Sequence, residues 1–93
     1  MKKVHNNIRI TGKVQGVGFR ETTKYFADQA GVKGFVRNEA DGSVYIEAEA
    51  EQWELDSFVE WCNEGPDRAK VEGCEVVVSD ELKYFRDFVI LKK

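Results

Sequence analysis

The chain has 93 residues, a length that suits one domain, 1–93, with a core large enough for independent folding. Hydrophobic residues make up 42% of it and charged residues 33%, which is typical of a soluble globular protein and excludes a repetitive or extensively disordered chain. A formal net charge of −3 argues against a general nucleic-acid binder, which normally carries a basic excess. No apolar run approaches the roughly 20 residues needed to cross a bilayer, and residues 1–7 lack the apolar segment of a signal peptide, so we expect a cytoplasmic location.

A first strand is predicted over the residues before Gly12, because apolar side chains alternate there. Val4, Ile8 and Ile10 share one parity, as they would in a strand with one face on a core. The segment that follows, residues 12–20, reads Gly-Lys-Val-Gln-Gly-Val-Gly-Phe-Arg. It fits neither the Walker loop nor the dinucleotide-binding glycine pattern, so its chemistry has to be judged from its own residues.

Residues 12–20 are predicted to bind an anion, and phosphate is the natural candidate. Their glycines allow turns that are barred to other residues and let backbone N–H groups approach a ligand. Arg20 supplies a forked cation, and a helix beginning near it would add unpaired N–H groups and the positive end of its dipole. The alternative is a tight connection that needs glycine for its shape alone. The candidate phosphate-binding residues are Gln15, Gly16, Val17, Gly18, Phe19 and Arg20.

Two helices are predicted from apolar side chains at helical spacing. Gly31 stands where a left-handed cap would end the first helix, and the Gly-Pro pair at 65–66 would end the second. Trp53 and Trp61 are expected to pack at the border of the second helix's buried stripe. The first stripe consists of Phe19, Thr23, Phe26, Ala27 and Ala30, and the second of Leu55, Phe58, Val59 and Cys62. We expect both stripes to face the core.

Four further strands are predicted after the first helix. Residues 34–38 and 44–50 flank an Asp-Gly turn and should form a hairpin. The β-branched run within 70–79 predicts another strand, and alternation over 84–91 predicts a terminal one. The acidic residues of the hairpin, Glu47, Glu49 and Glu51, are expected on its solvated face.

The resulting order, β-α-β-β-α-β plus a terminal strand, predicts an α+β fold. It suits a ferredoxin-like split β-α-β sandwich, with two helices packed on one face of a largely antiparallel sheet of four to five strands.

Two motifs carry a resemblance to a known family. Residues 10–20 are similar to the acylphosphatase signature, hydrophobic-x-Gly-x-Val-Gln-Gly-Val-x-Phe-Arg, with every fixed position filled. A second family motif stands at 34–38, Gly-Phe-Val-Arg-Asn, followed by Gly42 and Val44. Ala50 replaces a glycine usual in the family, so the end of that strand is expected to pack or bend slightly differently, without loss of chemistry. The resemblance spans nearly all of the chain.

The resemblance implies an enzyme that hydrolyses small acyl phosphates to a carboxylate and inorganic phosphate by metal-free, in-line attack of water. Arg20 and Asn38 are its expected catalytic residues, Arg20 on the phosphoryl oxygens and Asn38 on the water. No cofactor is expected, and inorganic phosphate is the expected product or inhibitor. A small polar domain without a heptad pattern is expected to be a monomer, with neither nucleic acid nor membrane as a partner.

Other polar residues are not assigned to the chemistry. The single histidine, His5, is placed before the first strand and away from either motif, and one histidine with two separated cysteines falls short of a four-ligand metal set. Whether Cys62 and Cys74 form a disulfide stays open. Arg37 should face away from Asn38 on its strand, and Lys13 is expected to be solvated.

Two alternatives remain. A catalytically silent phosphate-binding or acyl-phosphate-binding regulatory module would keep the same loop without turnover. An RNA-binding ferredoxin-like domain is suggested by Lys33-Gly34-Phe35, but the next position is Val36 where that motif has glycine or alanine, and the chain is acidic.

Overall fold

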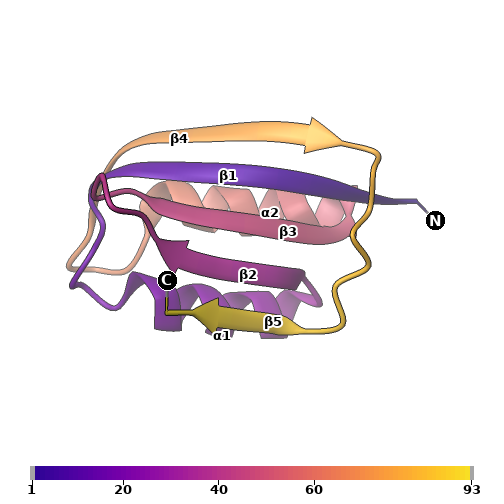
Figure 1. Ribbon diagram of the computed structural model, residues 1–93, viewed down its shortest axis with the longest axis horizontal. Coiled ribbons are helices and arrows are strands. Elements are labelled where there is room, and N and C mark those ends of the chain that lie inside the picture. The colour runs from indigo at the N-terminus through magenta and orange to yellow at the C-terminus, as the bar shows by residue number, and fades with distance from the viewer. Residues whose placement is uncertain (1, 93) are drawn as a thin grey trace.

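Five strands form one sheet, and both helices lie against the same face of it (Figure 1). The computed structural model describes residues 2–92; both ends of the predicted domain 1–93 therefore lie outside the described residues. None of the helices described is long and apolar enough to span a membrane. The elements in chain order are β1 (Lys3–Lys13), α1 (Phe19–Ala30), β2 (Lys33–Asn38), β3 (Val44–Glu51), α2 (Gln52–Glu64), β4 (Lys70–Ser79) and β5 (Phe88–Leu91).

The pairing of the strands confirms the predicted fold class. β1 pairs antiparallel with β3 and β4, and β2 pairs antiparallel with β3. The terminal strand β5 pairs in parallel with β2, which makes the sheet mixed but mostly antiparallel. The chain is thus an α+β, ferredoxin-like sandwich with a fifth strand at one edge.

The face of the sheet under the helices holds the hydrophobic core, as the alternation in β1 and β3 predicts. Val4, Ile8 and Ile10 of β1 are buried against the helices. β3 pairs regularly with β1 through Ala50, which is itself buried. The largest fully buried side chains include Phe19, Phe58, Phe88, Ile46 and Leu55.

Both helices end where the sequence predicts, but two of their aromatic residues, Phe26 and Trp53, are less buried than expected. Gly31 caps α1 in the left-handed conformation, with φ of 77°. Phe26 was expected in the core, yet it is 38% exposed and stacks on Trp61 at the surface of the helix layer. Trp61 does pack at the helix border, whereas Trp53 is 65% exposed because it lies on the outer side of α2 and donates a hydrogen bond to Glu51.

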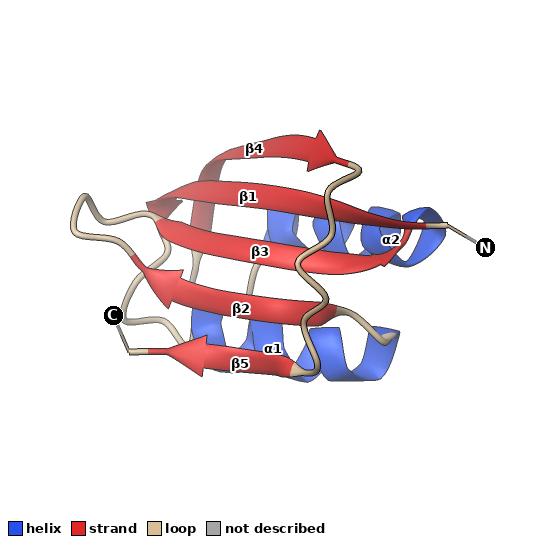
Figure 2. Cartoon of the chain, turned by 45° about the vertical axis from the view of Figure 1, so that its right-hand side comes forward, coloured by secondary structure: helices blue, strands red, loops and turns tan. Residues whose placement is uncertain are grey.

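The open face of the sheet differs most from the prediction. Only residues 88–91 of the predicted strand 84–91 are extended in the sheet, and the connection from β4 to β5 crosses the face opposite the helices (Figure 2). This connection covers Glu47 and Glu49, which are buried rather than solvated. His5 lies within β1, not before it, and is buried beside Glu49.

Cys62 and Cys74 are both free in this structure. Cys62 is buried in α2, and burial raises the pKa of its thiol well above the ordinary value. Burial also raises the pKa of the Cys74 thiol. Both side chains therefore remain neutral thiols at physiological pH, and they behave as small core residues.

Candidate active site

The loop between β1 and α1 reaches its conformation through glycine. Gly16 and Gly18 have φ of 73° and 79°, in the left-handed region. A Cβ built at either position meets no other atom within 4 Å, so glycine is needed there for the backbone conformation and not for close packing. The open space beside both residues leaves their backbone accessible to a ligand.

The first turn of α1 has no cap from a side chain. Gly18 is its N-cap residue, and the first N–H that bonds back is that of Thr22, to the Gly18 carbonyl oxygen at 3.1 Å. The preceding N–H groups of the turn have no acceptor within the helix. α2 differs, because a capping box of Glu51 and Glu54 satisfies its N-terminus. The uncapped end of α1 therefore presents free N–H donors and the positive end of the helix dipole.

Arg20 is placed by its neighbour in α1. The Phe19 side chain is buried in the core and fixes the start of the helix, while Arg20 is half-buried and turned outward into a pocket. Within residues 2–92, no carboxylate forms an ion pair with the Arg20 guanidinium. Its fork of N–H donors is therefore available to an anion.

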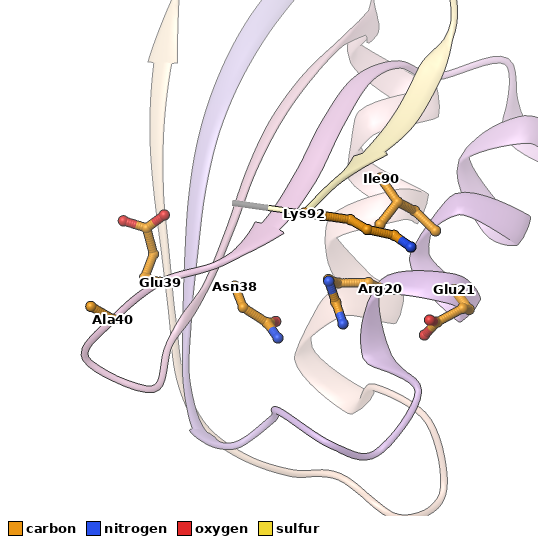
Figure 3. A pocket seen from close by; sticks show the side chains of 7 residues that line it. All are labelled: Arg20, Glu21, Asn38, Glu39, Ala40, Ile90 and Lys92. Carbon is orange, nitrogen blue, oxygen red and sulfur yellow. The ribbon is translucent and has the colours of Figure 1, made fainter.

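Asn38 reaches the same pocket from the end of β2. Val36 is buried under the helices, so alternation puts Asn38, two residues on, at the same face of the sheet. In Figure 3 the side chains of Asn38 and Arg20 point toward one another across the pocket. The two predicted catalytic residues, eighteen positions apart in the sequence, thus meet because the N-terminus of α1 and the C-terminal end of β2 lie at one edge of the fold.

The pocket has a volume of about 680 Å³ and takes part of its wall from the end of the chain. β5 runs parallel to β2 with Val36 opposite Ile90, and Lys92 follows the end of β5 and lines the same pocket as Asn38. Ile90 and Lys92 were not predicted as site residues, because alternation in a strand does not reveal which strand it pairs with. The lining residues are Arg20, Glu21, Asn38, Glu39, Ala40, Ile90 and Lys92.

The acidic residues at the pocket do not lie between Arg20 and Asn38. Glu39 points away from Asn38 and forms an ion pair of 2.6 Å with Arg37 (Figure 3). Glu21 lies on the far side of Arg20. Arg37 also lies over the rings of Phe35 and Tyr45, on the open face of the sheet, as its predicted orientation away from the site requires.

Residues 15–20 differ in whether their side chains or only their backbone groups can contact a ligand. Val17 and Phe19 bury their side chains in the core, so only their backbone groups are available to an anion. The Gln15 side chain is also engaged, because its amide donates hydrogen bonds to the turn between β2 and β3. A bound anion would consequently meet mainly backbone N–H groups and the Arg20 guanidinium.

This combination defines the class of protein: a small ferredoxin-like α+β domain with an uncapped helix N-terminus beside a pocket at one edge of its sheet. A comparison with protein families narrows the class. The family model described as acylphosphatase matches residues 6–90, so the chain belongs to the acylphosphatase family and is a hydrolase that acts on acyl phosphates.

Individual relatives agree with this assignment. The chain is 50% identical over 80 residues to an acylphosphatase of Salinibacter ruber, covering 86% of this chain and 84% of that one. The crystal structure of acylphosphatase from Bacillus subtilis superposes with a TM-score of 0.93 at 38% identity, covering 95% of this chain and 98% of the other. A structure of full-length HypF in a phosphate- and nucleotide-bound form matches with a TM-score of 0.85 at 30% identity, covering 97% of this chain and 12% of HypF.

Proposed function

We propose that the chain hydrolyses small acyl phosphates by metal-free, in-line attack of water on phosphorus, with Arg20 and Asn38 as the catalytic residues. The observation that carries this proposal is the meeting of Arg20 and Asn38 across one pocket, beside the uncapped N-terminus of α1 (Figure 3). Arg20 would bind two phosphoryl oxygens in its plane, and the backbone N–H groups of residues 15–20 would bind the remaining charge. Asn38 would orient the water.

The reaction needs no strong acid. The bond that breaks joins phosphorus to a carboxylate oxygen, and the leaving carboxylate has a conjugate-acid pKa of about 4, so it departs at neutral pH without a proton. The bond that forms joins phosphorus to the water oxygen, and the water's proton passes to a phosphoryl oxygen. Because charge is spread over the phosphoryl oxygens in a loose transition state, positioning and electrostatic stabilisation supply most of the catalysis.

Asn38 is suited to orienting the water because its side-chain amide stays neutral throughout the reaction. Its side-chain carbonyl accepts a hydrogen bond from water and its NH₂ group donates one, so it can hold the oxygen in line with the leaving carboxylate. In Figure 3 the carboxylate of Glu39 points away from Asn38, and that of Glu21 lies on the far side of Arg20. We therefore assign neither of them as a general base.

The acyl part of the substrate would occupy the rest of the pocket, where the apolar lining residues are Ala40 and Ile90. Because the proposed contacts are to the phosphoryl group and the pocket is open around the acyl group, we expect the site to accept several acyl groups. We further propose that inorganic phosphate binds at the loop as product and inhibitor, and that residues 1–93 fold as one domain that acts as a monomer in the cytoplasm.

Hydrolysis of a model aromatic acyl phosphate in the presence of a chelator tests the proposal, with the Arg20→Ala variant as control. We expect chelator-resistant turnover that falls by roughly a hundredfold or more in the variant, as for the loss of one preorganised donor. Chelator-sensitive turnover would contradict the metal-free mechanism. Absence of turnover, with phosphate still raising the melting temperature, would instead favour the silent regulatory module.

A further inference from the structure

We infer that Gln15 is a positioning residue, whose side-chain amide fixes the turn next to Asn38 against the phosphate-binding loop. The inference rests on the proposed role of Asn38. The side chain of Gln15 would thus hold the turn, while its backbone N–H would still bind the phosphoryl group. The observation behind it is a pair of hydrogen bonds that join two segments of the site.

Both N–H groups of the Gln15 side-chain amide donate hydrogen bonds to the turn between β2 and β3. Nε2 donates to the carbonyl oxygen of Glu39 at 2.8 Å and to the carbonyl oxygen of Ser43 at 2.9 Å. Both partners are acceptors only, so the nitrogen and not the oxygen of the amide must face them. A side chain with a single donor, or with none, loses at least one of these two hydrogen bonds between the loop and the turn.

The turn itself is already closed by its own hydrogen bonds. The N–H of Glu39 donates to Ser43 O at 2.9 Å, and the N–H of Gly42 donates to Glu39 O at 3.1 Å. Asp41 accepts hydrogen bonds from the backbone N–H and the hydroxyl of Ser43. Gln15 is therefore not needed to form the turn, and what its amide adds is the connection between the turn and the loop.

This connection acts on Asn38 through the adjacent residue. Asn38 ends β2 opposite Val44, and Glu39, whose carbonyl Gln15 holds, is the next residue along the chain. The same loop leads into α1 and Arg20. Gln15 thus sets the separation between the residue that positions water and the groups that hold the phosphoryl oxygens, a distance on which in-line attack depends steeply.

Replacement of Gln15 by methionine removes both donors while keeping a side chain of similar length. We expect Gln15→Met to lower kcat by between about tenfold and a hundredfold, the effect of a displacement near 1 Å. The dissociation constant of inorganic phosphate should change by less than about twofold. Gln29→Met makes the same substitution at an exposed position of α1 and should leave both values unchanged.

A double-mutant cycle separates a positioning role from a merely structural one. If Gln15 acts through Asn38, Gln15→Met should have little further effect on the residual rate of Asn38→Ala, because groups that act as a unit are strongly non-additive. Additive losses, or a loss of phosphate binding equal to the loss of kcat, would overturn the inference. If Gln15→Met does not fold, Gln15→Asn, whose amide is one methylene too short to reach the turn, takes its place in the cycle.

The side-chain amide signal of Asn38 in an NMR spectrum provides a measurement that does not rely on activity. The signal is identified by its absence in Asn38→Ala, and we expect it to shift in Gln15→Met and not in Gln29→Met. An unchanged Asn38 signal in Gln15→Met would contradict the positioning role. Full turnover in Asn38→Ala would contradict the proposed function instead, so the two failures are distinguishable.

Discussion

Arg20 and Asn38 differ in charge and in hydrogen-bonding groups, so they suit different parts of the reaction. The Arg20 guanidinium is a permanent, planar cation that forms no ion pair within residues 2–92. Asn38 is neutral and presents one acceptor and two donors. Arg20 is therefore suited to a charge that is present in the substrate and grows in the transition state, and Asn38 to a molecule of water.

The geometry of the Arg20 fork predicts the result of a conservative change. Arg20→Lys keeps the charge at the pocket but replaces two parallel N–H donors by one compact ammonium group. We expect kcat/KM to fall by at least about tenfold, because the second phosphoryl oxygen loses its partner. Steady-state kinetics of the wild type and Arg20→Lys at matched ionic strength measure this change. An unchanged kcat/KM in Arg20→Lys would show that a positive charge alone is enough for catalysis.

The sequence predicted these two residues and missed others at the same site for a physical reason. Arg20 and Asn38 belong to contiguous motifs, so their neighbours in sequence identify them. The hydrogen bonds of the Gln15 side chain and the position of Lys92 depend on which strands are adjacent in the sheet. The parallel pairing of β5 with β2 leaves no trace in the alternation of either strand.

At the scale of the elements, β2 must approach β3 very closely where Gly34 lies. Its φ is 149°, and a Cβ placed there would come within 1.8 Å of the Glu47 carbonyl oxygen. Gly42, in the turn, has φ of 94°, but a Cβ there meets nothing within 4 Å. Glycine is therefore required at 34 for space as well as for conformation, and at 42 for conformation alone.

This contrast predicts unequal effects of alanine at the two positions. Gly34→Ala should lower the free energy of unfolding by about 3 kcal/mol, because backbone must move to relieve the overlap. Gly42→Ala should lower it by about 1 kcal/mol, from the left-handed conformation alone. Urea unfolding of both variants measures the difference. Equal losses would show that the strands can separate at Gly34 without strain.

The connection from β4 to β5 crosses the open face of the sheet (Figure 2), and hydrogen bonds to Glu49 hold it there. The Glu49 carboxylate accepts hydrogen bonds from the backbone N–H groups of Lys83 and Tyr84, and His5 Nδ1 lies 2.7 Å from it. Burial by itself would raise the pKa of Glu49, but the backbone N–H of Lys83 and the His5 side chain outweigh burial and leave the pKa below its usual value.

A lowered pKa makes this contact sensitive to acid. The ionised carboxylate stabilises the folded chain fully at pH values above the unfolded pKa, near 4.5, and the contribution disappears as the pH falls through the lower folded pKa. We expect Glu49→Gln to be less stable than wild type at pH 7 and to lose less stability on acidification to pH 3. Urea unfolding across this range tests it, with Glu75→Gln, at an exposed position of β4, as the control. The same pH dependence in wild type and Glu49→Gln would refute the role of Glu49.

For the whole molecule, the order of elements and the core face could be predicted because they follow from local periodicity. Strand alternation identified the buried side of β1 and β3, and glycine marked the end of each helix. The open face could not be predicted in the same way. Glu47 and Glu49 have the polarity of solvated residues, and they are buried only because a segment more than thirty positions away crosses over them.

The sheet places the N-terminus of α1 and the ends of β2 and β5 at one edge, where we propose that Arg20 binds the phosphoryl group and Asn38 orients the water. Phosphate binding and turnover, measured side by side in Asn38→Ala, test that division most directly. We predict that kcat falls by at least about a hundredfold while the dissociation constant of inorganic phosphate stays within about twofold of wild type, because Asn38 serves the water and not the anion. A loss of phosphate binding as large as that in Arg20→Ala would contradict the claim.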